Sequence, residues 1–163
     1  MASGSTGSTP KALARHRRRA FGFVFQAGLL VADLSLEENV ALPLMLDGVA
    51  RRLALRRAAA GLAEVGIQRL ASRLPGEVSG GEAQRATIAR ALVTRPRIGF
   101  ADEPTGSLDS FNAELVLGLL LAAVRDHGAA LLLVTHDQAM AGRLDRVVQL
   151  RDGRLTGGGE AGA

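Results

Sequence analysis

The chain has 163 residues and a formal net charge of +4, with 47% hydrophobic and 22% charged residues. This length suits one domain with a sizeable core, and the composition is typical of globular proteins. The absence of cysteine excludes disulfides and thiolate metal ligands. No apolar run reaches the ~18 residues that a membrane span requires.

Residues 1–20 are predicted to be a disordered, basic leader. Residues 1–12 are small and polar without periodicity, whereas the arginine-rich residues 12–20 suggest a short helix or a linker. A basic run can bind nucleic acid or anionic lipid. Because no Trp or Tyr is present to stack on bases, we expect a solvated arginine face and no nucleic-acid partner.

Two segments follow the leader. Residues 21–26, FGFVFQ, predict a buried strand that ends in the polar Gln26. Residues 37–73 have the spacing of amphipathic helices, and Pro43 and Gly48 are expected to interrupt them. The second segment could equally be an ordinary helical pair.

The most informative stretch begins at Ser79, a residue type that commonly caps helices. Gly80 and Gly81 follow it and leave the first helical N–H groups accessible, which predicts an anion-binding site. The helix is expected to run from Gly80 to about Thr94, because Pro96 ends it.

A short strand from Ile98 then leads to two adjacent carboxylates, Asp102 and Glu103. Carboxylates at the end of a buried strand suit a metal ion and a polarised water. A helix start that can bind a phosphate, together with two carboxylates that can hold a metal ion and act as a base, indicates phosphoryl-transfer chemistry.

The last third predicts a helix over residues 112–127 and a strand over residues 129–135. The strand sequence, AALLLVT, is continuously apolar, as in parallel strands covered on both faces. His136 follows that strand. Asp152-Gly153 predicts a hairpin turn, and residues 157–163 are expected to be a flexible tail.

Three of these segments resemble motifs of ATP-binding cassette (ABC) ATPases, in the family's order and spacing. Residues 78–82, VSGGE, resemble the signature motif; residues 98–103 resemble the Walker B strand; and residues 107–109 resemble the D-loop. The resemblance implies an α/β fold: an incomplete P-loop NTPase (ABC cassette) core with a parallel sheet, over residues 21–156, and a helical signature subdomain over about residues 37–94.

The resemblance also implies roles for residues and the cofactors ATP and Mg²⁺. Asp102 would hold the magnesium, Glu103 would polarise the attacking water, and His136 would steady the γ-phosphate. Gln26 would contact the metal and report to the membrane partner, and Asp109 would link two sites. The signature residues Ser79, Gly80, Gly81 and Glu82 would face ATP bound mainly to a second cassette.

One family motif is missing from the sequence. A Walker A loop needs the pattern G-x-x-x-x-G-K-[ST], but the only lysine, Lys11, lies between Pro10 and Ala12. The family's N-terminal β-subdomain is absent as well. We therefore expect a gap in the sheet, beside the strand that leads to His136, and a marginally stable chain.

The first functional interpretation is an ATP-binding subunit of an ABC membrane transporter. It would work with a transmembrane permease and a second cassette, in the cytoplasm at the inner face of the cell membrane. Residues 23–26, 38–43 and 102–106 resemble cassettes of the lipoprotein-release, macrolide-export and cell-division branch. A non-catalytic cassette remnant that docks on a permease or an intact cassette is the alternative. A DNA-maintenance ATPase ranks last, because no heptad repeats separate Gln26 from Ser79.

Overall fold

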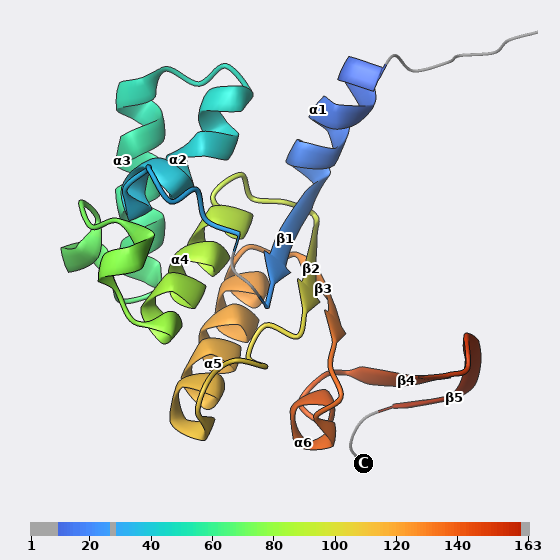
Figure 1. The fold of residues 1–163 in the computed structure, drawn as a ribbon. Coiled ribbons are helices and arrows are strands. Elements are labelled where there is room, and N and C mark those ends of the chain that lie inside the picture. Colours follow the sequence, from blue (N-terminus) through green and yellow to red (C-terminus); the bar gives the residue numbers. More distant parts are fainter. Residues whose placement is uncertain (1–9, 27–28, 161–163) are drawn as a thin grey trace, which may run out of the picture.

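The computed structural model describes residues 10–26 and 29–160. The described elements (Figure 1) are α1 (Pro10–Ala20), β1 (Phe21–Phe25), α2 (Leu36–Leu46), α3 (Arg51–Glu64), α4 (Gly80–Leu92), β2 (Ile98–Asp102), α5 (Ser110–Asp126), β3 (Ala130–Val134), α6 (Gln138–Ala141), β4 (Arg146–Arg151) and β5 (Arg154–Glu160), with two 3-10 turns at Gln68–Leu70 and Pro75–Glu77. None of the described helices combines the length and apolar character that a membrane crossing requires.

The central feature is a parallel three-stranded sheet in the order β1-β2-β3. Its register aligns Phe25 with Asp102 and Asp102 with Val134, so the three strands end at the same level. β4 and β5 form a separate antiparallel hairpin whose turn residues, Asp152 and Gly153, both have positive φ. The parallel sheet confirms the predicted α/β fold.

Helices cover one face of this sheet. α4 packs on β1 and α5 packs on β3, while α2 and α3 pack together and on α4. Figure 1 shows α2 and α3 standing beside the sheet, with α4 between them and the strands and α5 below α4. The fully buried side chains that join these helices include Leu36, Leu62, Ile88 and Leu120.

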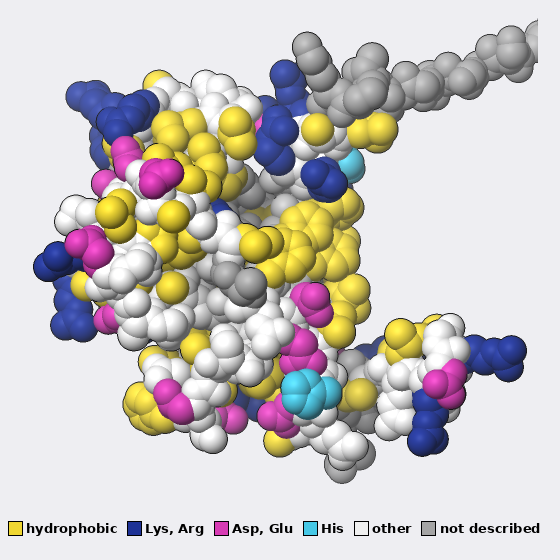
Figure 2. Space-filling model, viewed as in Figure 1, with side chains coloured by type: hydrophobic (Ala, Val, Ile, Leu, Met, Phe, Trp, Pro, Cys, Tyr) yellow, Lys and Arg dark blue, Asp and Glu magenta, His cyan; other side chains and the backbone are white. Residues whose placement is uncertain are grey.

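The opposite face of the sheet is not covered by a described helix. The register places Phe23, Phe100 and Leu132 side by side on that face. The rings of Phe23 and Phe100 stack with centroids 5.3 Å apart, and Figure 2 shows a broad hydrophobic area here. Leu132 and Val134 are each 55% exposed. The sequence prediction of a strand covered on both faces was therefore wrong for β3.

β3 is also an edge strand, since among the described residues it pairs with β2 alone. A groove of about 660 Å³ separates its free side from β4, with Leu132, Val134, Val148 and Leu150 among its lining residues. The expected gap in the sheet lies beside the strand that leads to His136, as the sequence predicts. Parallel strands are normally flanked on both sides and buried on both faces.

Several boundaries differ from the sequence predictions. Residues 10–20 form the ordered helix α1 rather than a disordered leader, and residues 1–9 lie outside the described residues. α2 continues through Pro43, which lies inside the helix, and the chain turns at Gly48 with φ 88°. β5 extends to Glu160, into the segment predicted to be a flexible tail; residues 161–163 are not described.

Helix α4 ends at Leu92, two residues before the predicted end. Arg95 adopts the left-handed conformation, φ 52°, and its N–H donates to the carbonyl oxygen of Leu92 at 2.8 Å. A left-handed residue terminates a helix by satisfying its last carbonyl groups. Pro96 therefore follows a helix that has already ended.

Gly22 lets α4 lie directly on β1, and this contact yields a test of the packing. A Cβ atom at Gly22 would lie 2.4 Å from the carbonyl oxygen of Ala91, a backbone atom that cannot rotate away. We predict that Gly22→Ala lowers the free energy of unfolding by about 3 kcal/mol, measured by urea denaturation.

The matched control is Gly118→Ala, since nothing lies within 4 Å of a Cβ at this position in α5. It should raise stability by about 0.5–1 kcal/mol, because alanine favours a helix over glycine. Equal effects of the two substitutions would contradict the described contact between β1 and α4.

Candidate functional site

The aligned strand ends bring together residues that are far apart in the sequence. Gln26 follows β1, Glu103 follows β2, and Thr135 and His136 follow β3. Together with Asp102, the last residue of β2, these residues form what we call the strand-end cluster. Ligands bind at this end of parallel sheets in α/β proteins, so the cluster is the first candidate for the functional site.

The side chain of Glu103 is held by the residues that follow β3. Its Oε1 atom accepts hydrogen bonds from the His136 backbone N–H at 2.9 Å and lies 2.7 Å from His136 Nδ1. Its Oε2 atom accepts a hydrogen bond from the Thr135 hydroxyl at 3.3 Å. A carboxylate offers about four acceptor positions, so one position on Oε2 stays free for a water molecule.

The backbone of Glu103 is strained. Its φ is 43°, in the left-handed region that residues with a Cβ rarely occupy. Such a conformation costs about 1–3 kcal/mol and occurs preferentially at functional sites. In this backbone conformation the carboxylate of Glu103 points to the residues that follow β3. The preceding residue, Asp102, still pairs within the sheet as the last residue of β2.

Glu103 and His136 shift each other's pKa. Partial burial alone would raise the pKa of Glu103, but the hydrogen bonds from the side chain and backbone of His136 outweigh it and hold this pKa below the ordinary 4.5. The hydrogen bond to Glu103 raises the pKa of His136 above the ordinary 6.5. The histidine is 84% exposed, so it stays accessible to a ligand.

The residues at the strand ends fit a magnesium ion that a nucleotide also holds. Within the described ranges, no three His, Cys, Asp or Glu side chains form a metal site of their own. Mg²⁺ commonly binds through one or two carboxylates plus substrate phosphates, which matches the exposed Asp102 carboxylate. The amide of Gln26 lies against Gly106, where a Cβ atom would be 2.9 Å from its nitrogen. The missing side chain at Gly106 thus makes room for Gln26.

The second group of predicted residues surrounds the start of α4; we call it the signature cluster. Ser79 is the N-cap of α4, and Glu82 completes a capping box: the Ser79 hydroxyl accepts from the Glu82 N–H at 3.3 Å, and Glu82 Oε2 accepts from the Ser79 N–H at 2.9 Å. The bond from the Ser79 backbone lowers the pKa of Glu82 below its ordinary value.

The predicted anion-binding site at the start of α4 is therefore only partly accessible. The carboxylate of Glu82 folds back over the helix start, whereas the N–H groups of Gly80 and Gly81 donate to no described acceptor. The sequence prediction overlooked this internal anion, since a glutamate three residues after the cap serves as the capping partner. An incoming phosphate at this helix start has to displace Glu82 or pair beside it.

Asp109 joins the signature cluster to α5. It caps α5 by accepting from the backbone and side-chain N–H groups of Asn112 at 3.0 and 2.6 Å, and the backbone bond lowers its pKa. The Asn112 side chain in turn fills the space beside Gly81, where a Cβ atom would lie 2.9 Å from Asn112 Oδ1. Asp109 thus has a structural role at the helix start in addition to the role that the resemblance implies.

The structure does not merge the two clusters. No hydrogen bond or ion pair between described residues connects Ser79 or Glu82 with Glu103 or His136. A hydrogen bond of Gln84 connects the elements that carry the two clusters. Gln84 is a buried residue of α4, and its Nε2 donates to the Phe25 carbonyl oxygen at 3.2 Å. Because Phe25 precedes Gln26, this bond ties the signature helix to the loop of the strand-end cluster.

Sequence reasoning missed Gln84, Asn112 and Thr135 as positioning residues. Thr135 directly precedes His136, a predicted site residue, and this adjacency could have identified it from the sequence. Gln84 and Asn112 have no comparable signal, since their partners become apparent only when the helices pack.

Comparisons with known proteins show which family this chain belongs to. The family model described as ABC transporter matches residues 3–106, more than half of the chain. The chain belongs to the ABC transporter family. The lipoprotein-releasing system ATP-binding protein LolD of Granulibacter bethesdensis is 48% identical over 139 residues, and LolD of Syntrophus aciditrophicus is 45% identical over 145 residues.

A solved structure shows the same fold. The dimeric ATP-binding cassette MJ0796 bound to ADP and Pi superposes with a TM-score of 0.83 and 34% identity, over 94% of this chain and 68% of that chain. The chain spans 61% of the Granulibacter relative and 65% of the Syntrophus relative. More than a third of each relative therefore has no counterpart here.

The paired shifts of Glu103 and His136 predict how the pair depends on pH. The lowered pKa of Glu103 means that its contribution to stability is present above pH 4.5 and is lost as pH falls through its folded-state pKa. The raised pKa of His136 means that its contribution is present below pH 6.5 and is lost as pH rises through its folded-state pKa. The pair should thus be intact between these two folded-state values.

An NMR titration of the His136 ring checks this expectation. Glu103→Gln should return the His136 pKa toward its ordinary value, whereas Asp137→Asn removes a weaker influence and should change it less. A His136 pKa that is the same in the wild type and in Glu103→Gln would contradict the described pair.

Proposed function

We propose that this chain is an ATP-binding subunit of an ABC transporter and that it supplies a signature half-site, Walker B carboxylates and a switch histidine. The observation that carries the proposal is Glu103, which His136 and Thr135 hold while one acceptor position stays open. That arrangement suits a base that receives a proton from an attacking water.

The residues of this chain have separable tasks in the proposed reaction. Asp102 would hold magnesium with the phosphates, and Gln26 would complete that contact. Glu103 would orient the water and accept its proton, and His136, with its raised pKa, would stabilise negative charge on the γ-phosphate. Bound Mg·ATP supplies the transferable phosphoryl group and neutralises its charge.

The signature cluster would act on ATP held mainly by a second cassette. The free N–H groups of Gly80 and Gly81 would form the donor set at this helix start, which favours an anion. The Ser79 hydroxyl donates to Glu82 Oε2 at 2.9 Å, so it becomes available to a phosphate only when that carboxylate moves. Because Glu82 partly neutralises that helix start, the proposal requires its carboxylate to move aside. The separation of the two clusters within one chain supports a site completed by a second cassette.

The missing Walker A loop limits what this chain does alone. No lysine is available to hold the β- and γ-phosphates, and the free edge of β3 has no strand beside it in the described residues. The chain therefore serves the nucleotide of a partner cassette and holds its own nucleotide poorly. A non-catalytic module that docks on a permease or an intact cassette is the second candidate, and the same missing lysine favours it.

A groove between α1, β1, α2 and α4 is the proposed docking surface for the permease. It measures about 300 Å³ and is lined by apolar side chains, of which Leu29 and Leu46 are 60% and 61% exposed. Arg17 and Arg18 stand at its border. The similarity to LolD proteins supports a permease of the lipoprotein-releasing type, which would place the chain at the inner face of the cell membrane.

Complementation of an inactive relative tests the half-site. In the Granulibacter LolD protein, the residue that aligns with Ser79 is changed to arginine, and this variant should be inactive by itself. We predict that adding this chain restores ATP hydrolysis, because Ser79 then serves the ATP that the relative holds. Ser79→Arg in this chain should remove that gain by roughly 100-fold, whereas Glu103→Gln should lower only the hydrolysis that takes place at this chain's own strand-end cluster.

The outcomes separate the candidate functions. Co-elution of the two proteins without restored hydrolysis would favour the non-catalytic module and contradict the half-site. Loss of hydrolysis in Glu103→Gln would support Glu103 as the base at this chain's own strand-end cluster, and unchanged hydrolysis would limit this chain's part to the signature cluster.

Substitutions in the groove test the docking surface. Leu29→Glu and Leu46→Glu place a buried charge in the proposed interface and should weaken binding to lipoprotein-release permease subunits in nanodiscs by more than about tenfold. Leu155→Glu, at a 74% exposed position on β5, is the matched control. Equal binding by all three variants, measured by surface plasmon resonance, would place the interface elsewhere.

A further inference from the structure

The ends of three helices enclose a hollow that the proposed function does not use. The walls come from the last turns of α3, α4 and α5, and the volume is about 360 Å³, within the range of small-molecule sites. His127 caps the C-terminal end of α5, while Asp109 caps its N-terminal end. The 17-residue helix is roughly 25 Å long, so the hollow is remote from the signature cluster.

The floor of the hollow is apolar. It is lined by the buried side chains of Leu44, Val65, Ala89 and Leu92. An apolar floor favours a hydrocarbon portion of a ligand, because binding removes apolar surface from water.

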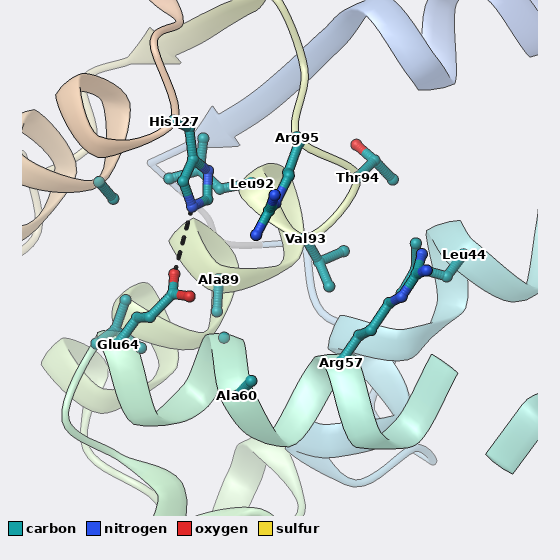
Figure 3. A pocket seen from close by; sticks show the side chains of 13 residues that line it. Leu44, Arg57, Ala60, Glu64, Ala89, Leu92, Val93, Thr94, Arg95 and His127 are labelled. Atoms are coloured by element: carbon teal, nitrogen blue, oxygen red, sulfur yellow. Dashed lines mark ion pairs between the residues drawn. The ribbon is translucent and has the colours of Figure 1, made fainter. Parts of the chain in front are cut away.

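The rim carries an excess of positive charge. Arg57 and Arg95 line the hollow, and their guanidinium groups form no hydrogen bond or ion pair with any described residue. Glu64 is the only acidic lining residue, and it already pairs with His127, whose Nε2 lies 3.5 Å from Glu64 Oε2. Figure 3 shows His127 and Arg95 extending into the same hollow, with Glu64 reaching up to His127 from α3.

One local feature distinguishes this hollow from a chance gap between helices. His127 has a buried Nδ1 atom without a hydrogen-bond partner among the described residues, and such atoms are rare in native structures. The termination of α4 accounts for the left-handed backbone of Arg95, and the helix dipole favours its positive charge. Neither accounts for the second arginine at the rim, Arg57.

We propose that this hollow binds a small amphipathic anion, a carboxylate on a short hydrocarbon chain, with Arg57 and Arg95 as the charge partners. Guanidinium groups bind carboxylates through strong charge-assisted hydrogen bonds, and the apolar floor receives the hydrocarbon. Because α3 and α5 both contribute to the wall, a bound anion links the helical layer to the helix that covers β3.

Binding of hexanoate to the purified chain at neutral pH tests the proposal, monitored through the arginine side-chain N–H signals in NMR. Saturable shifts at Arg57 and Arg95 are expected. Arg95→Gln and Arg57→Gln should each weaken the affinity about tenfold. Arg97→Gln and Arg56→Gln are matched controls, since both are exposed neighbours outside the hollow, and they should leave the affinity unchanged.

Two further probes separate the head group from the hydrocarbon. Hexylamine, which has the same chain and the opposite charge, should not bind, and inorganic phosphate should bind at least tenfold more weakly than hexanoate. Absence of saturable hexanoate binding, equal weakening by the control variants, or equal binding of hexylamine or phosphate would each overturn the proposal.

Discussion

The parallel register of β1, β2 and β3 is the constraint on which the candidate site depends. Phe25, Asp102 and Val134 lie at the same level, so the residues that follow them leave the sheet together. A slip of one residue would turn the side chains of a strand to the opposite face and separate Glu103 from His136. The contacts of Glu103 with the end of β3 are therefore a consequence of the strand alignment, reinforced by the left-handed backbone at Glu103.

The same register shows where the sheet is incomplete. Phe23, Phe100 and Leu132 share the face that no described helix covers, and β3 has a free edge. Leu132 and Val134 are each 55% exposed. Since the chain spans 61% of the Granulibacter relative, we infer that the exposed edge and face are the places where the remaining part of a cassette belongs.

The sequence predicted those parts of the molecule that depend on neighbouring residues. Strand ends, caps and the hairpin were predictable because Asp102-Glu103, Ser79 and Asp152-Gly153 carry local signals. Contacts between distant segments were not: Gln84 reaches Phe25 across 59 positions, and its role follows only from the packing of α4 on β1. The sequence analysis also did not predict that the Glu82 carboxylate competes with an external anion for the start of α4, where it occupies part of the space that Gly80 and Gly81 leave open.

We propose that this chain carries catalytic carboxylates and a signature half-site but has no phosphate-binding loop of its own. Calorimetric titration of the purified chain with Mg·ATP, without any partner, measures this property. We predict no saturable binding into the millimolar range, because no lysine-bearing loop surrounds the phosphates. Saturable binding that is lost in Asp102→Ala would contradict it, since the nucleotide would then be held at the strand ends of this chain alone.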